Sequence, residues 1–345
     1  MKVLFLSDNT PTTEMYHPII SQLKCDYLIT KTDYNIVQKE KPDVIVMARE
    51  ETTPDEHKIV DSGIPTLLIP HGMLMPEVTK KLWGNGRKST HYKRLMFQAI
   101  YKIKHGESPL RLLKTGLFRL KNDYKNGVLS KYSGFTKIAV YGEAMKDTLI
   151  KYDVKPENIV VTGNPKFDKY YGKIRRNNGY VLLLTEYFVE FGYWTPKQRE
   201  SYLKHIWLAT SINKLNLVVK IHPVLERKDD YEKLAKIFNF KVYQHESLSD
   251  LILNCNMAVT LLSSAGLEVM IAGKPLIIYN PYKDPTIYES VALYAKDRTS
   301  LFNAMGCAKY YETLGAEEFV KNHAYIQDGK SSERIANLIM EMANC

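Results

Sequence analysis

The chain has 345 residues, of which 45% are hydrophobic and 25% are charged, as in a soluble globular protein with room for two domains. Its four cysteines are scattered, without CxxC or metal-ligand spacing, which argues against a disulfide framework or a zinc site and for a reducing compartment. No apolar run approaches the ~20 residues that span a bilayer, and the opening MKVLFLSDNTP is too short for a signal-peptide core. We therefore expect a cytoplasmic protein whose membrane contact, if any, is peripheral.

The net charge of +10 comes from one segment. Residues 80–131 contain 14 Lys and Arg against only Glu107 and Asp123, a net charge of +12, and aromatic and aliphatic residues are interleaved with them. Such a segment is typical of a surface that docks an anionic partner: a lipid headgroup, a polyanionic acceptor or nucleic acid.

Short apolar runs flanked by Gly, Pro or Asn predict two series of buried parallel strands. The first series comprises Val3–Leu6, Val44–Met47, Thr66–Ile69, Lys137–Tyr141 and Ile159–Val161. The second comprises Tyr180–Leu184, Leu217–Ile221, Phe240–Tyr243, Ala258–Leu262 and Leu276–Tyr279. Helical patterns between them, such as Glu143–Tyr152 and Thr195–Asn213, predict an α/β protein with open parallel sheets.

The polar segment 164–179 separates the two series and predicts a linker. We accordingly expect an N-terminal domain over 1–163, a C-terminal domain over 180–330 and a last helix over 331–345. The basic segment 80–131 interrupts the first domain between its third and fourth predicted strands. Connections of that length are usually functional or mobile, and we expect one or two helices in it.

Ligands of open parallel sheets bind beyond the carboxyl ends of the strands, so residues there are site candidates. His71 follows the third predicted strand beside Gly72, and a histidine there can act as a general base. His222 closes the strand Leu217–Ile221 and can reach a phosphate.

The pair Ser263–Ser264 precedes a predicted helix over Ala265–Ala272. Two hydroxyls, free backbone N–H groups and the helix dipole would together suit a phosphate or pyrophosphate. Glu268, one turn into this helix, can accept ribose hydroxyls. Thr185–Glu186 is a weaker candidate for phosphate or base contacts.

Other nucleotide and hydrolase patterns are absent from the sequence. Gly84–Thr90 lacks the GxxxxGK[ST] spacing and follows no predicted strand, the loop after the first strand has no glycine, and neither GxSxG nor HExxH occurs.

Five segments, in order, resemble the GT-B glycosyltransferase superfamily. They are PHGMLMPE, ENIVVTGNPKFDKY, VVKIHP, LSDLILNCNMAVTLLSSAGLEVMIAGKPLIIYNP and DGKSSERIANLI. Within the superfamily they are most similar to CDP-glycerol glycerophosphotransferases and to capsule and surface-polysaccharide transferases, and VTGNPKFD is similar to a segment of the Kdo transferases. The resemblance spans about Thr66 to Leu338 without the basic segment.

The resemblance implies two Rossmann-like domains, with the acceptor bound by the first, the nucleotide-activated donor by the second, and no metal or other cofactor held by the protein. It assigns the general base to His71, donor-phosphate binding to His222, Ser263 and Ser264, and contact with the nucleotide to Glu268. Asn164, Lys166, Asp284 and Tyr288 follow as secondary candidates.

Two departures from the glycerophosphotransferase pattern leave the donor open. The position of Glu268 is commonly Asp in that group, and Ala258-Val259-Thr260 lacks an aspartate often found shortly before the serine pair.

We therefore expect a glycosyltransferase that moves a sugar from a CMP-, CDP- or UDP-linked donor to a surface-glycan or lipid-linked acceptor. The docking residues would hold it at the inner face of the cell membrane; they are Arg87, Lys88, Lys93, Arg94, Arg111, Lys114 and Arg119. Glycerophosphate transfer and UDP-sugar 2-epimerisation are the alternatives within enzymes. Nucleic-acid binding through the basic segment is the alternative outside them, and it leaves the histidine and serine residues without a role.

Overall fold

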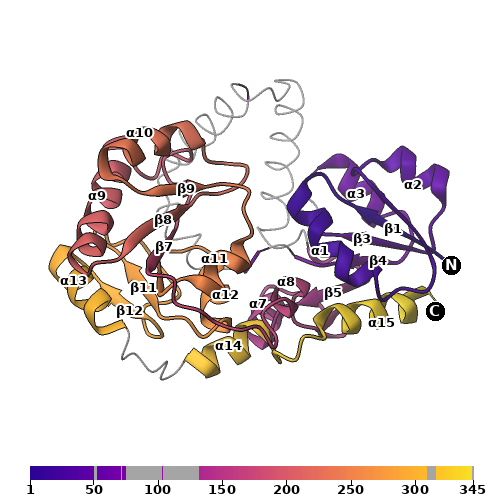
Figure 1. The fold of residues 1–345 in the computed structure, drawn as a ribbon. Coiled ribbons are helices and arrows are strands. Elements are labelled where there is room, and N and C mark those ends of the chain that lie inside the picture. The colour runs from indigo at the N-terminus through magenta and orange to yellow at the C-terminus, as the bar shows by residue number, and fades with distance from the viewer. Residues whose placement is uncertain (50–52, 71, 75–102, 104–131, 309–315, 344–345) are drawn as a thin grey trace. The chain divides into compact units, whose positions relative to one another are not determined.

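The computed structural model describes residues 1–49, 53–70, 72–74, 103, 132–308 and 316–343 (Figure 1). It divides into two compact units. Among the described residues, the first unit comprises those within 1–74, 132–171 and 321–343, and the second comprises Ile103 and those within 172–320.

The first unit holds a six-stranded parallel sheet of order β2-β1-β3-β4-β5-β6. Its strands are β1 (Lys2–Leu6), β2 (Asp26–Thr30), β3 (Val44–Met47), β4 (Thr66–Leu68), β5 (Lys137–Val140) and β6 (Ile159–Val161). Its helices are α1 (Thr10–Ile20), α2 (Tyr34–Glu40), α3 (Pro54–Val60), α7 (Glu143–Lys151), the 3-10 helix η2 (Pro156–Asn158), α8 (Pro165–Asp168) and α15 (Ser331–Ala343).

The second unit holds another six-stranded parallel sheet, of order β12-β11-β10-β7-β8-β9. Its strands are β7 (Tyr180–Leu184), β8 (Asn216–Lys220), β9 (Lys241–Tyr243), β10 (Met257–Thr260), β11 (Leu276–Tyr279) and β12 (Leu293–Ala295). Its helices are α9 (Pro196–Ile212), α10 (Lys228–Phe238), α11 (Leu248–Asn254), α12 (Ala265–Ile271) and α13 (Arg298–Cys307), and α14 (Ala316–Ala324) crosses the division between the units.

All ten predicted strands coincide with observed strands to within two residues, and the α/β class with two parallel sheets is confirmed. The sequence analysis missed β2 and β12. Both are edge strands that carry no run of fully buried residues, because an edge strand is covered less completely than a central one.

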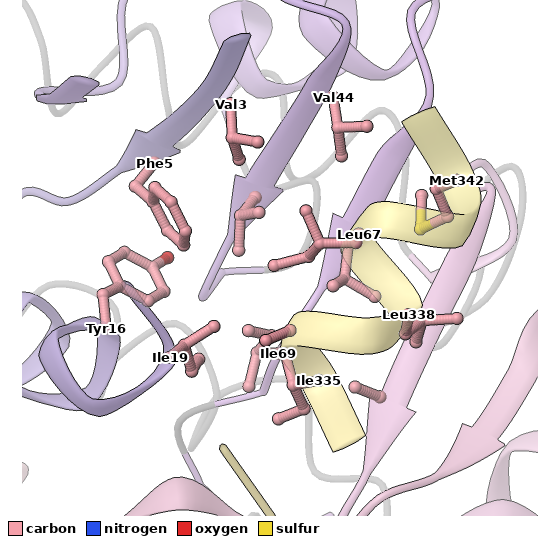
Figure 2. Close-up of a cluster of buried hydrophobic side chains, with 14 of the residues drawn as sticks. Val3, Phe5, Tyr16, Ile19, Val44, Leu67, Ile69, Ile335, Leu338 and Met342 are labelled. Carbon is pink, nitrogen blue, oxygen red and sulfur yellow. The ribbon is translucent and has the colours of Figure 1, made fainter. Parts of the chain in front are cut away.

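The last helix, α15, packs on the sheet of the first unit (Figure 2). Ile335, Leu338, Ile339 and Met342 recur at helical spacing and are buried against Val3, Val44 and Leu67 of the central strands. The chain thus returns to the first unit after completing the second. The sequence predicted this helix but not the sheet that it covers.

The observed division differs from the predicted domain boundaries in two places. The segment Asn164–Tyr171, predicted as linker, contains α8 and lies in the first unit, and the return to that unit begins at Lys321 rather than at Ser331. The first difference arises because α8 contacts α15 and α1.

Candidate functional site

The strand order places a topological switch point in each unit. In the second unit the chain builds β7, β8 and β9 in one direction and then β10, β11 and β12 on the other side of β7, so the switch point lies at the carboxyl ends of β7 and β10. In the first unit it lies at the carboxyl ends of β1 and β3. Open α/β sheets bind ligands at such points, because the helices that follow diverge to opposite faces of the sheet.

Glu186 bridges the switch point of the second unit. It follows β7, and its Oε1 accepts hydrogen bonds from the loop after β10: from the backbone N–H groups of Leu261 (3.2 Å), Leu262 (2.8 Å) and Ser263 (2.8 Å). The Thr260 hydroxyl donates to the same oxygen at 2.7 Å. Three successive amides converging on one oxygen form an anion-binding nest, and here the protein's own carboxylate fills it.

The serine pair consequently offers fewer free amides than the sequence analysis expected. The N–H of Ser263 is bonded to Glu186, and the N–H of Ala265 bonds the Ser263 hydroxyl at 3.3 Å. Ser264 is exposed at the start of α12, and its side chain makes no capping hydrogen bond. What this turn can present to a ligand is therefore the exposed Ser264 rather than the amides of Ser263 and Ala265.

Tyr288 supports the serine turn from inside. Its ring is fully buried, and its hydroxyl donates to the Ser263 carbonyl at 2.9 Å. Gly266 lies against this ring: a Cβ at Gly266 would stand 3.0 Å from Cζ of Tyr288. The structure thus places Tyr288, a secondary candidate, as a buried support of the turn.

The second predicted phosphate-binding residue, His222, lies in the turn after β8. Its Nδ1 accepts from the backbone N–H groups of Val224 (3.2 Å) and Leu225 (3.0 Å), so a neutral ring carries its proton on Nε2. The ring of Tyr187 stands edge-on to it at 5.1 Å. His222 is therefore held in the tautomer that donates through Nε2.

Glu226 ties this turn to the end of β7. Its Oε2 accepts from the backbone N–H of His222 at 2.7 Å and from the Thr185 hydroxyl, and its Oε1 accepts from the Tyr231 hydroxyl. Glu226 is 3% exposed. The Thr185 hydroxyl, predicted to contact a phosphate, therefore donates its proton to Glu226 and links the end of β7 to the His222 turn.

Three carboxyl groups at this sheet edge have raised pKa values. Burial is the main cause for Glu186, Glu190 and Glu226, and it outweighs the hydrogen bonds that Glu186 and Glu226 accept. Arg199 pairs with Glu190 at 2.7 Å and stacks on the Tyr231 ring at 4.8 Å. Oε2 of Glu190 is buried without a hydrogen-bond partner in the part of the chain that the structure describes.

Of two other predicted residues of the second unit, Glu268 is buried and Asp284 is half-buried. Glu268 is 8% exposed on α12, which leaves little of its surface for a ribose. Asp284 accepts from the indole N–H of Trp194 at 2.9 Å, and burial raises the pKa of its carboxyl group. Its backbone N–H donates to Asn280 at 2.9 Å.

Two segments of the resemblance meet in the first unit and form a clasp, by which we mean the contacts of Asp168 and Gly163 with the start of α15. The Asp168 carboxylate accepts from the N–H groups of Ser331 (3.0 Å) and Ser332 (2.8 Å) and from the Ser332 hydroxyl (2.7 Å). Gly163 has φ +78°, and a Cβ there would lie 2.5 Å from the Ser331 hydroxyl oxygen. The VTGNPKFD and DGKSSER segments thus attach the last helix to its sheet.

Asn164 and Lys166 belong to the same region. The Asn164 side chain is fully buried; its Oδ1 accepts from the N–H of Lys166 at 2.9 Å and caps α8. Its Nδ2 makes no hydrogen bond to the described residues. Asn164 therefore has one structural hydrogen bond and one buried donor left over.

His71 and the seven docking residues, Arg87, Lys88, Lys93, Arg94, Arg111, Lys114 and Arg119, lie outside the described residues. The residue before His71 is described: the Tyr141 hydroxyl donates to the Pro70 carbonyl at 2.7 Å, at the carboxyl end of β4. At the switch point of this unit, Asp8, Thr12, Thr32 and Arg49 line a small pocket.

Within the described ranges, no helix is long and apolar enough to cross a membrane, and no cluster of three or more His, Cys, Asp or Glu side chains is arranged to hold a metal ion.

Solved structures of two kinds match this architecture over 99% of the chain. The UDP-GlcNAc 2-epimerase of Methanocaldococcus jannaschii, in complex with UDP-GlcNAc and UDP, is 14% identical, with a TM-score of 0.61 and 100% of its chain covered. The wall teichoic acid polymerase TagF with CDPG is 11% identical, with a TM-score of 0.65 and 88% of its chain covered. The chain has a GT-B fold.

Residues 197–341 match the family model of the CDP-glycerol:poly(glycerophosphate) glycerophosphotransferases. The matched range begins in α9 and ends in α15, and it contains the His222 turn and the serine pair. No curated protein sequence matches the chain significantly. The resemblance to this family and to GT-B enzymes that the sequence indicated is confirmed.

The sequence analysis did not single out Glu226, and it gave Glu186 only together with Thr185 as a weaker candidate. Both follow predicted strands within a few residues, which is the signal that could have found them. Their partners lie far away in the chain: Glu186 bonds residues 74–77 positions distant.

Proposed function

We propose that this protein is a transferase that moves a group from a nucleotide-activated donor to a hydroxyl of a surface-glycan or lipid-linked acceptor. The observation that carries the proposal is the family match over residues 197–341, because this range holds both turns beside the switch point of the second unit. The first unit would bind the acceptor.

The residues of the second unit would bind the donor phosphates through neutral donors. Nε2–H of His222 and the hydroxyl of Ser264 can each donate to a phosphate oxygen. The backbone N–H of His222 is bonded to Glu226, and that of Ser263, the residue before Ser264, is bonded to Glu186. Donors fixed before the reaction stabilise the charge that develops on the departing nucleotide without reorganisation. The proposal requires no metal held by the protein.

His71 is the general base in this proposal. It follows Pro70 at the carboxyl end of β4, the sheet edge where ligands of the first unit would bind. Removing the proton of the attacking hydroxyl contributes about 10²–10⁴-fold in rate. His71→Ala should therefore lower transfer by that factor without weakening nucleotide binding, and unchanged transfer across the pH range would reject the assignment.

The family match favours glycerol phosphate from CDP-glycerol as the transferred group, and transfer of a sugar from a CMP-, CDP- or UDP-linked donor is the alternative in the same reaction class. A thermal-shift panel of CMP, CDP, UDP, GDP and ADP distinguishes the donors. One nucleotide at about 100 times its Kd should stabilise the protein by about 3 kcal/mol. Ser264→Ala should reduce that shift while leaving the melting temperature of the free protein unchanged; a panel without any shift would count against the proposal.

UDP-sugar 2-epimerisation is a second candidate, favoured by the likeness to epimerase structures over 99% of the chain. The sequence offered no carboxylate-rich site for moving a proton, but the structure places Glu186, Glu190 and Glu226 at one sheet edge. Incubation with UDP-GlcNAc, followed by proton NMR, separates the candidates. Epimerisation inverts C2 without an acceptor, whereas a transferase needs one.

The basic segment 80–131 would hold the protein on an anionic membrane near its acceptor. About 1 kcal/mol per engaged basic residue is enough for reversible binding by a handful of them. Cosedimentation with phosphatidylglycerol vesicles should fall as salt rises above the physiological range and when Arg111, Lys114 and Arg119 are replaced by Gln. If vesicle binding changed neither with salt nor with these substitutions, the membrane role would be rejected. Tighter binding to nucleic acid than to vesicles would indicate nucleic-acid binding as the role of the segment instead.

A further inference from the structure

One carboxylate oxygen of Glu186 accepts hydrogen bonds from the protein, and the other does not. Oε1 accepts the four hydrogen bonds of the loop after β10, described above. Oε2 makes no hydrogen bond among the described residues, and it is not among the buried polar atoms without partners. An unpartnered oxygen outside that set keeps some solvent-exposed surface, and Glu186 as a residue is partly exposed, so a ligand can reach this second oxygen.

The position of that oxygen is fixed by the rest of the site. Four donors on Oε1 prevent the carboxylate from rotating, and the loop that supplies them is held by the Tyr288 hydroxyl on the Ser263 carbonyl. An acceptor held in place before binding loses little entropy when a ligand arrives. The accessible oxygen is therefore a preorganised acceptor at the switch point.

The ligand group that suits this oxygen is a hydroxyl. An ionised carboxylate only accepts hydrogen bonds, and it repels phosphate oxygens. The donors suited to phosphate lie to either side: Ser264 in the turn after β10 and His222 in the turn after β8. A nucleotide-activated donor carries hydroxyls on both sides of its diphosphate, on the ribose and on the transferred group.

We propose that Glu186 accepts a hydrogen bond from a hydroxyl of the nucleotide-activated donor and thereby helps to select it. The inference rests on the proposed donor site and adds a recognition residue to it. If that hydroxyl belongs to the ribose, Glu186 has the role that the sequence analysis gave to Glu268, whose side chain is buried on α12.

The test is calorimetric titration of three ligands: CDP, 2′,3′-dideoxy-CDP and CDP-glycerol. Each is titrated into the wild type, Glu186→Gln and the control Glu200→Gln, which removes a carboxylate from the exposed side of α9. The glutamine oxygen can still accept from the loop amides, so the loop keeps its bonds while the outer acceptor becomes an NH₂ group. Melting temperatures of the variants check the fold.

Two results support the proposal, because a hydrogen bond to a charged group changes affinity by about 10- to 100-fold. If Glu186→Gln lowers the affinity for CDP by about tenfold or more and leaves the affinity for dideoxy-CDP within about twofold, the hydroxyl belongs to the ribose. If only the affinity for CDP-glycerol falls, the hydroxyl belongs to the transferred group. Glu200→Gln should leave the affinities for all three ligands unchanged.

Equal losses for all three ligands, or no loss for any, would overturn the proposal and leave Glu186 as a structural anchor of the loop. If the wild type bound no CDP compound, the same titration with UDP, dideoxy-UDP and UDP-GlcNAc would follow. A wild type that binds neither series would overturn the donor site itself, a result distinct from the failure of Glu186 alone.

Discussion

At the scale of single residues, the carboxylates of Glu186 and Glu226 determine which donors of the site are already bonded within the protein. Glu186 binds the amides of the serine turn, and Glu226 binds the backbone N–H of His222 together with the Thr185 hydroxyl. In the proposed donor site, the groups that would bind the donor phosphates are the Ser264 hydroxyl and the His222 imidazole N–H. Polar groups that are buried and paired in this way are held rigidly, and leaving a partner unpaired would cost about 1–3 kcal/mol.

A pair of substitutions separates the two nitrogens of His222. Asn at this position retains an acceptor near the place of Nδ1, which the Val224 and Leu225 amides need, but removes the Nε2 donor. Gln retains a donor near Nε2 and loses the acceptor. We expect His222→Asn to weaken CDP binding about tenfold with little change in melting temperature, and His222→Gln to lower stability by about 1 kcal/mol while binding more CDP than His222→Asn.

Titration calorimetry and thermal unfolding measure the two effects. Equal CDP affinity in both variants would mean that Nε2 does not donate to the nucleotide.

At the scale of elements, the clasp attaches the start of α15 to the first unit. The Asp168 carboxylate lies at the N-terminus of α15, where it accepts otherwise unpaired N–H groups and interacts favourably with the helix dipole. Arg334, one turn later, donates to the Thr162 carbonyl at 2.7 Å. The helix is therefore anchored by polar contacts at its start and by apolar packing along its length.

Asp168→Ala should weaken this anchor. Loss of an N-terminal cap costs about 1–2 kcal/mol, and here three hydrogen bonds are lost together. Amide hydrogen exchange of α15 should accelerate in the variant more than that of the central strands. The matched control is Asp147→Ala, on the exposed side of α7, which should leave α15 unchanged. Unaltered exchange of α15 in Asp168→Ala would show that apolar packing alone holds the helix.

At the scale of the whole molecule, the second unit concentrates carboxyl groups whose pKa burial raises, among them Glu226. Above the ordinary pKa of 4.5, and up to the raised value, the folded state binds more protons than the unfolded state. The contribution of Glu226 to the free energy of unfolding is therefore largest at low pH and falls as the pH rises through this window. His205, whose pKa burial lowers, contributes in the opposite direction.

Comparison of the wild type with Glu226→Gln isolates one group, because the contribution of His205 cancels in the difference. The variant loses a strong acceptor and should be less stable than the wild type at pH 5. Its deficit should shrink by pH 7.5, where the wild type must bury a charge that glutamine does not carry. Urea denaturation at both pH values measures the difference, and a deficit that grows with pH would contradict the sign of the shift.

The sequence by itself determined the two sheets, ten of their strands, the last helix and the turns that carry His222 and the serine pair. These features are local, because each depends on an apolar run and on the residues that directly follow it in the sequence. β2 and β12 gave no such signal, because edge strands are less buried.

The tertiary structure alone decided which groups remain free for a ligand. It placed Glu186 in the amide nest that a phosphate was expected to fill, made Glu226 the partner of His222, and joined Asp168 to the start of α15. The partners of Glu186 and Asp168 lie from 74 to 164 positions away. The sequence shows which side chains can form hydrogen bonds, but it does not show their partners, because the packing of the whole unit determines which groups lie next to each other.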